Sequence, residues 1–148
     1  MISNKDTRLI AVFEHWELYL HEETTPYLGR CIAWAKRPNA QRYTDMTSEE
    51  NEELRMIVGV WFEALSGWLI EEGQPAPYRE NISVLGNSTP HLHAHLIPRY
   101  EKPVTVFGTV FTDPRPGHHY KPYEKKASNP KTVLRITEAL RTTIRSAR

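Results

Sequence analysis

Three histidines alternate with apolar residues in one short stretch of the chain, and their spacing limits the chemistry that they can perform. The stretch is residues 90–99, with the sequence PHLHAHLIPR. Strict alternation is typical of a strand, in which successive side chains point to opposite faces. His91, His93 and His95 would therefore share one face, and the apolar residues between them would point into a core.

The spacing of the histidines leaves three interpretations open. A strand rises about 3.3 Å per residue, so neighbouring histidines stand roughly 6.6 Å apart and the outer pair roughly 13 Å. Two histidines at i and i+2 can bind one metal ion, but a metal site would need a further ligand from elsewhere. Alternatively, the central imidazole is a nucleophile, because a pKa of about 6.5 leaves it neutral at pH 7. The third interpretation is a merely polar sheet face. We favour covalent catalysis.

Composition sets the class of protein in which this stretch acts. The 148 residues, of which 39% are apolar and 25% charged, suit one globular domain. The net charge of +1 gives no general attraction to nucleic acid or to an anionic membrane, so an anionic substrate must be held locally. Cys31 is the only cysteine, which excludes an intramolecular disulfide. Because signal-type and membrane-spanning apolar runs are also absent from the sequence, we expect a cytoplasmic protein.

Periodic patterns predict the elements that position the histidines. We expect a short N-terminal helix at residues 7–14 and an antiparallel hairpin whose strands begin near residue 16 and residue 29. The clearest helix starts at Thr47-Ser48-Glu49-Glu50, which fits a capping box, and continues with apolar residues at helical spacing until Gly73. A strand at 81–85 and a polar turn at 86–89 lead into the histidine strand.

The part of the chain after Arg99 contains weaker signals. Residues 104–111 have strand-like composition, and residues 113–120 are rich in turn formers and could cover the site. Their histidines, His118 and His119, are either exposed loop residues or contacts to a metal or substrate. The basic run 121–126 is either a solvated surface or a phosphate contact. Asn129-Pro130 then predicts the start of a terminal helix.

The seven residues from His91 to Ile97 resemble the complete signature of the histidine triad (HIT) family, His-φ-His-φ-His-φ-φ with φ apolar. Gly86, five residues before the first histidine, and Pro98-Arg99 after the motif also resemble the family pattern. The resemblance spans about residues 16–99. It implies an α+β fold, in which a long helix packs on an antiparallel sheet, usually in a homodimer. We expect one domain over residues 1–148, with a core at about 7–111 and a C-terminal extension at 112–148.

The HIT family consists of nucleotide hydrolases and nucleotidyl transferases, and the resemblance implies a role for each histidine. His93 would attack the α-phosphorus of a nucleotide and form a nucleotidyl-histidine, from which water releases the nucleoside monophosphate. His91 would orient His93 through its backbone carbonyl and fix its tautomer. His95 would contact the phosphate or the leaving-group oxygen, as an acid or a hydrogen-bond donor. Histidine rather than glutamine at this third position favours hydrolysis over the uridylyl-transfer branch.

The resemblance also implies binding residues. Asn87 and Ser88, beside Gly86, would bind α-phosphate oxygens or the bridging oxygen, and Asn81 would reach the ribose or the phosphates. The chain departs from the pattern at Arg30, which follows a glycine where many members carry a further histidine. Its permanent charge either binds phosphate oxygens or faces solvent. The segment between Asn81 and Gly86 is also shorter than in the branches that hydrolyse adenosine phosphoramidates and diadenosine triphosphate.

We predict a nucleotide hydrolase that cleaves a phosphoanhydride or phosphoramidate bond at the α-phosphate, with a dinucleoside polyphosphate such as diadenosine tetraphosphate as the expected substrate. No cofactor is required, although Mg²⁺ would accompany the substrate phosphates, and the expected partners are the nucleotide and a second copy of the chain. Two alternatives stay open. One is a metal enzyme or metal-binding protein that uses triad histidines with His118, His119 or Asp113. The other is a non-catalytic, dimeric nucleotide-binding module.

Overall fold

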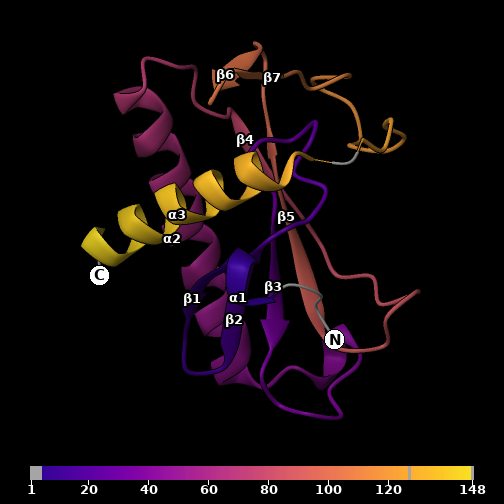
Figure 1. Ribbon diagram of the computed structural model, residues 1–148. Coiled ribbons are helices and arrows are strands. Elements are labelled where there is room, and N and C mark those ends of the chain that lie inside the picture. Colours follow the sequence, from indigo (N-terminus) through magenta and orange to yellow (C-terminus); the bar gives the residue numbers. More distant parts are fainter. Residues whose placement is uncertain (1–4, 127, 148) are drawn as a thin grey trace.

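The computed structural model describes residues 5–126 and 128–147, and its main feature is a five-stranded antiparallel sheet in the order β1-β2-β3-β5-β4 (Figure 1). In chain order the elements are α1 (Lys5–Arg8), β1 (Leu9–Val12), β2 (Trp16–Leu20), β3 (Cys31–Ala35), the 3-10 helix η1 (Tyr43–Asp45), α2 (Ser48–Glu71), β4 (Arg79–Ser83), β5 (His93–Arg99), β6 (Val104–Val106), β7 (Thr109–Phe111) and α3 (Pro130–Ala147). The predicted α+β class is confirmed. None of these helices is both long and apolar enough to cross a membrane.

The histidine strand lies inside the sheet, between β3 and β4. Its even-numbered residues Ala94 and Leu96 are fully buried in the main core, as the alternation predicts. The same core contains apolar side chains from α2 and from α3, which crosses α2 in Figure 1. These two helices therefore cover one face of the sheet and leave the odd-numbered residues of β5 on the other.

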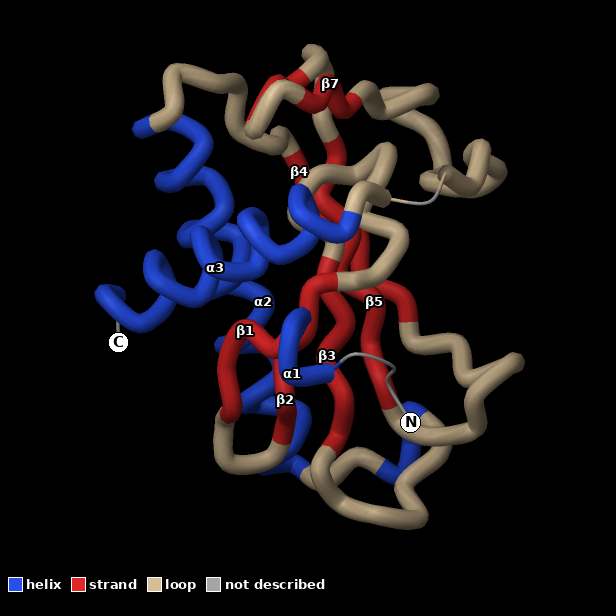
Figure 2. Tube along the Cα trace, viewed as in Figure 1, coloured by secondary structure: helices blue, strands red, loops and turns tan. Residues whose placement is uncertain are grey.

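The other face of the sheet carries a second, smaller apolar cluster formed by Tyr27, Ile97 and Tyr120, with Tyr123 packed against it. Tyr120 and Tyr123 belong to the segment after β7, residues 112–126, which we call the C-terminal strap. Figure 2 shows this segment as a long loop on the side away from α2 and α3. The first part of the predicted extension, the strap, therefore lies over the face of the sheet that carries the histidines, whereas its second part, α3, packs on the opposite face.

Helix α2 begins as the sequence predicts. The Thr47 side chain accepts a hydrogen bond from the Glu50 backbone N–H (3.1 Å), and the Glu50 carboxylate accepts one from the Thr47 N–H (2.8 Å). This reciprocal pair satisfies two N–H groups that have no partner within the helix. Gly73, at a positive φ of 71°, follows the helix end at a backbone conformation that favours glycine. The capping signals thus fix both ends of the longest helix.

The N-terminal prediction is wrong in its extent. Helix α1 covers only Lys5–Arg8, and the next residues form β1, which pairs with β2. A helix over 7–14 would have buried Val12, whereas Val12 is 46% exposed and Ile10 is buried. Pairing with β2 provides hydrogen-bond partners for the backbone groups of this short apolar segment. These hydrogen bonds outweigh the helical spacing of its apolar residues.

Two further elements differ from their predicted boundaries. The strand expected at 81–85 is β4, which begins and ends two residues earlier. The strand-like segment 104–111 is a hairpin of β6 and β7, because Phe107 and Gly108 both adopt positive φ and reverse the chain. Helix α3 does follow Asn129, whose side-chain oxygen accepts from the Lys131 backbone N–H at 2.9 Å.

Candidate active site

The register of the sheet determines where the triad histidines lie. His93 pairs with Trp34 on β3, and His95 lies between Ile32 on β3 and Ser83 on β4. His91 precedes β5, and its backbone N–H donates to the Thr89 carbonyl at 2.9 Å. The prediction of one continuous histidine strand is therefore correct for two of the three residues.

His93 is held by its neighbour through the backbone. Its Nδ1 lies 2.5 Å from the His91 carbonyl oxygen, which can only accept a hydrogen bond. Nδ1 therefore carries the proton, and Nε2 of the neutral ring keeps its lone pair. The His91 ring in turn donates from Nε2 to the Ala35 carbonyl at 2.7 Å. Both imidazoles are thus fixed in defined tautomers, and His93, at 6% exposure, lines a cleft together with His95.

Trp34 supports both of these rings. Its indole stacks on His91 with centroids 4.3 Å apart and on His93 with centroids 5.5 Å apart. Trp34 also lines the cleft. Trp34 was not among the predicted site residues because an aromatic residue in an apolar strand resembles a core residue. Its place beside the site follows from the register of β3 and β5, in which Trp34 pairs with His93.

His95 is a neutral hydrogen-bonding group. Burial, and then the neighbouring positive charges, of which Arg30 has the largest effect, together lower its pKa to about 4. Arg30 Nη2 lies 3.4 Å from His95 Nδ1, and because a guanidinium only donates, this nitrogen accepts. The proton of the neutral ring is then on Nε2. His95 therefore offers the cleft a hydrogen-bond donor without a positive charge.

His21 also lines the cleft, although it was not among the predicted site residues. It follows directly after β2, and its ring centroid lies 5.6 Å from that of His95. Its Nδ1 accepts from the Glu23 backbone N–H at 3.0 Å. Burial, and then the charge of Arg30, lower the pKa of His21 to about 2. Its position on the polar side of an alternating strand was the available signal.

Arg30 does not face solvent, so one of its two predicted orientations is excluded. The side chain is 3% exposed and lines the cleft. Its Nη1 donates to the Tyr123 hydroxyl at 2.7 Å, and its Nε has no hydrogen-bond partner among the residues that the structure describes. Within residues 5–126 and 128–147, Arg30 forms no ion pair with a carboxylate. A buried cation without a counter-charge is costly, so the site favours an arriving anion.

The cleft beside the triad has a volume of about 460 Å³ and brings together most of the predicted site. His93 and His95 line it with Arg30 and with the three turn residues predicted to bind substrate, Gly86, Asn87 and Ser88. Gly86 has a positive φ of 75°, which lets the turn approach the histidines without strain. Arg8, His21 and Trp34 also line it and were not predicted. Lys121, Tyr123 and Lys125 line it as well, and they belong to the run 121–126 for which a phosphate contact was one of two interpretations.

Two predicted site residues lie outside this cleft. His91 lines a neighbouring depression with Trp34. The Asn81 side-chain oxygen accepts from Arg99 Nη1 at 3.0 Å, and Asn81 is not among the residues that line the cleft. The structure therefore shows Asn81 engaged in holding a buried arginine, while its predicted contact with the ribose or the phosphates stays a prediction.

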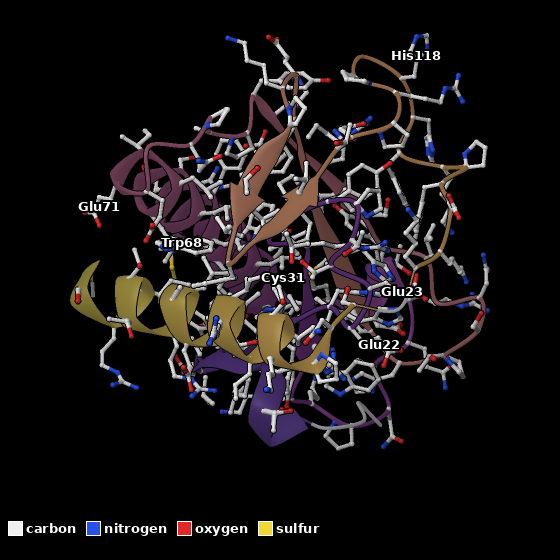
Figure 3. All side chains as sticks on the ribbon, turned by 45° about the horizontal axis from the view of Figure 1, so that its top comes forward. Glu22, Glu23, Cys31, Trp68, Glu71 and His118 are labelled. Atoms are coloured by element: carbon white, nitrogen blue, oxygen red, sulfur yellow. The ribbon has the colours of Figure 1, made fainter. Side chains whose placement is uncertain are left out.

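Positive charge dominates the cleft. Arg8, Arg30, Lys121 and Lys125 line it, against the two acidic residues Glu22 and Glu23. Figure 3 shows Glu22 and Glu23 close together near the loop side of the molecule, while Cys31 lies in its interior. Low-dielectric walls strengthen such a field, so the cleft attracts anionic ligands although the whole chain is nearly neutral.

The ligands proposed for a metal site do not converge on the triad. Asp113 is buried and bonded to Arg99, whereas His118 and His119 are exposed, and Figure 3 shows His118 at the outer edge of the molecule. Across the described ranges, the one group of three or more possible ligands with donor atoms within 4.8 Å is Glu14, His15 and Glu53. That group includes no triad residue.

Residues 19–102 match the family model described as HIT domain. Several solved structures share the fold at low sequence identity. A histidine triad protein from Bradyrhizobium japonicum has a TM-score of 0.67 at 22% identity, covering 97% of this chain and 96% of that one. A hypothetical histidine triad nucleotide-binding protein from Sulfolobus tokodaii has a TM-score of 0.68 at 16% identity, covering 94% and 84%. The diadenosine triphosphate hydrolase of Plasmodium falciparum has a TM-score of 0.63 at 10% identity, covering 98% and 80%. No curated protein sequence matches the chain.

Proposed function

Because this chain belongs to the histidine triad (HIT domain) family, we propose that it is a nucleotide hydrolase that acts at the α-phosphate through a covalent intermediate on His93. One observation carries the proposal. The His91 carbonyl fixes the proton of His93 on Nδ1, which leaves a lone pair on Nε2 of a residue that lines a cationic cleft. A histidine whose Nε2 lone pair is available in a cleft can act as a nucleophile.

In the first step, Nε2 of His93 attacks the α-phosphorus. A phosphorus–nitrogen bond forms, and the bond from phosphorus to the leaving group breaks. The imidazole becomes a cation that still donates from Nδ1 to the His91 carbonyl oxygen, which stabilises the positive charge. His95 donates a hydrogen bond from its Nε2–H to the leaving group as negative charge develops there.

In the second step, water attacks the same phosphorus. The phosphorus–nitrogen bond breaks, and the electron pair returns to Nε2, so His93 is regenerated in its starting tautomer. One proton of the water stays on the phosphate oxygen of the nucleoside monophosphate, and the other is released to solvent. Asn87 and Ser88 would hold the α-phosphate oxygens, since both residues line the cleft beside His93. The cations of the cleft would offset the charge of the phosphates.

The proposed substrates are dinucleoside polyphosphates such as diadenosine tetraphosphate, or nucleoside phosphoramidates. Four basic residues in the cleft support a ligand with several negative charges. One structural neighbour is named as a diadenosine triphosphate hydrolase, but at 10% identity this likeness extends only to the fold. No metal is required by the steps above, and Mg²⁺ would enter only with the substrate phosphates.

A homodimer and a cytoplasmic location stay part of the proposal. Strand β4 is an edge of the sheet, and Ile82 on it is 42% exposed. The nearby Leu85 is 51% exposed. Edge pairing of two copies would cover such apolar residues together with unpaired backbone groups.

The test is intact-protein mass spectrometry of the chain, mixed briefly with diadenosine tetraphosphate and quenched without acid. We expect a transient mass increase of one adenylyl group in the unaltered protein and in His118→Gly, a matched control at an exposed histidine. The adduct should be absent from His93→Gly, which should also release no adenosine monophosphate. An adduct that persists in His93→Gly would refute the assignment of the nucleophile. Nucleotide binding without any adduct or turnover, over dinucleoside polyphosphates and phosphoramidates, would instead favour a binding module.

A further inference from the structure

The surroundings of Arg30 are unusual for a buried cation. Two aromatic rings lie near its guanidinium, Tyr120 at 5.7 Å and Tyr123 at 5.6 Å from the guanidinium carbon. Both distances are within the range of cation–π attraction, which is stronger when water is excluded. The structure thus places Arg30 in an aromatic cage made by the C-terminal strap.

The Tyr123 hydroxyl connects the cage to an acidic residue. It accepts a hydrogen bond from Arg30 Nη1 at 2.7 Å and donates one to Glu23 Oε2 at 3.1 Å. A hydroxyl group can do both at once, because it has one proton and two lone pairs. The hydroxyl therefore bridges a guanidinium and a carboxylate that form no direct ion pair in the described part of the chain.

This arrangement has a consequence for ligand binding. An arginine that pairs directly with a carboxylate has little positive charge left for a ligand, whereas a neutral hydroxyl leaves that charge uncompensated. Across the described residues, Arg30 also retains an Nε without a partner. Tyr123 thus fixes the direction of the guanidinium and keeps it available to an anion.

The strap is firmly attached to the sheet, so it can hold a side chain in place. The Tyr120 hydroxyl donates to Ser83 Oγ at 3.3 Å, and the Tyr120 backbone carbonyl accepts from the Tyr27 hydroxyl at 2.5 Å. Tyr123 itself is partly buried. It lies beyond residues 19–102, which are the part of the chain that matches the family model.

We propose that Tyr123 is a positioning residue that orients Arg30 toward a phosphate oxygen of the substrate and keeps Glu23 from pairing with it. The proposal rests on the hydrolase function, since it concerns the same cleft. The ligand class is a nucleoside phosphate anion. The site is therefore incomplete without the strap, although the triad itself lies within the family domain.

The test compares Tyr123→Phe with Tyr78→Phe, whose hydroxyl accepts from the Gly117 backbone N–H in the strap but lies outside the cleft. In Tyr123→Phe the ring remains, while Glu23 can pair with Arg30 directly. We expect KM for diadenosine tetraphosphate and Kd for adenosine monophosphate to rise about tenfold, the effect of one hydrogen bond to a charged group, with kcat unchanged. Tyr78→Phe should leave both constants unchanged.

A second variant makes the test independent of small packing changes. Adding Glu23→Gln to Tyr123→Phe removes the competing carboxylate, so the double variant should recover most of the lost affinity. A merely structural role for Tyr123 would give no such recovery. The inference is overturned if Tyr123→Phe binds adenosine monophosphate as tightly as the unaltered protein, or if the double variant binds no better than the single one. Formation of the adduct on His93 is scored separately, so the inference can fail while the hydrolase function stands.

Discussion

The buried ion pair between Arg99 and Asp113 anchors the start of the C-terminal strap to the end of β5. The side chains of Arg99 and Asp113 are 3% and 0% exposed. Two hydrogen bonds join them, from Nε at 2.7 Å and from Nη2 at 3.0 Å. The carboxylate also accepts from the Tyr100 backbone N–H at 3.2 Å. Replacing Asp113 with leucine should therefore leave a buried cation without its counter-charge.

The expected loss follows from what Arg99 would retain. Breaking a buried pair by removing one partner costs about 3–5 kcal/mol in the free energy of unfolding. Arg99 would still donate to the Asn81 side chain and to the backbone carbonyls of residues 115 and 118, which are neutral acceptors. We therefore expect Asp113→Leu to lose about 3 kcal/mol, the lower end of that range. For a chain of this size the loss lowers Tm by roughly 6–12 °C.

The assay is urea denaturation of the single variants Asp113→Leu and Arg99→Leu and of the double variant. Removing both charges leaves no unpaired ion in the core, so the double variant should be more stable than Asp113→Leu alone. A loss below about 1 kcal/mol in Asp113→Leu, which is typical of an exposed pair, would refute the reasoning. So would a double variant less stable than both single variants.

Two further predictions concern the fold beneath the site. Gly29→Ala should lower the free energy of unfolding by about 1–3 kcal/mol, the usual cost of overpacking, because the new Cβ would lie 2.6 Å from Leu65 Cδ1 at a φ of 87°. Thermal denaturation would measure the loss. Gly67→Ala, which has open space around its Cβ, is the control and should lose no stability. The free energy of unfolding should be highest above pH 6.5 and decline as the pH falls toward 4. The pKa of His95 is 6.5 in the unfolded chain and about 4 in the folded protein, so between these values the unfolded state binds a proton that the folded state does not. His21, with a pKa of about 2, should extend the decline to lower pH. Urea midpoints measured from pH 8 to pH 4 test this, and a midpoint that rises on acidification would contradict it.

Local patterns predicted the part of the site that is continuous in sequence. Alternation placed Ala94 and Leu96 in the core and His93 and His95 on the opposite face, because strand geometry depends only on neighbours along the chain. The turn at 86–88 lies beside the histidines because it belongs to the connection, residues 84–92, between the adjacent strands β4 and β5. The capping box of α2 is equally local.

The rest of the site depends on contacts between distant residues. Tyr123 and Glu23 are 100 residues apart, and no periodicity relates them. Lys121 and Lys125 belong to a basic run that has the composition of a solvated surface. Their place in the cleft depends on the anchoring of the strap by Arg99 and Tyr120, which only the tertiary structure reveals. Whether Arg30 faces the cleft or the solvent could not be predicted for the same reason, since Tyr120 and Tyr123, which pack against it, lie in the strap.

The contact between the first strand and the last helix affects how the protein can fold during synthesis. Arg141 on α3 donates twice to the Leu9 carbonyl on β1, across 132 residues, and α3 supplies Ile136, Leu140 and Ile144 to the main core. The ribosome therefore synthesises all five strands of the sheet before the helix that completes its core. Until then, the nascent chain exposes apolar surface, and such intermediates are the species that aggregate or bind chaperones.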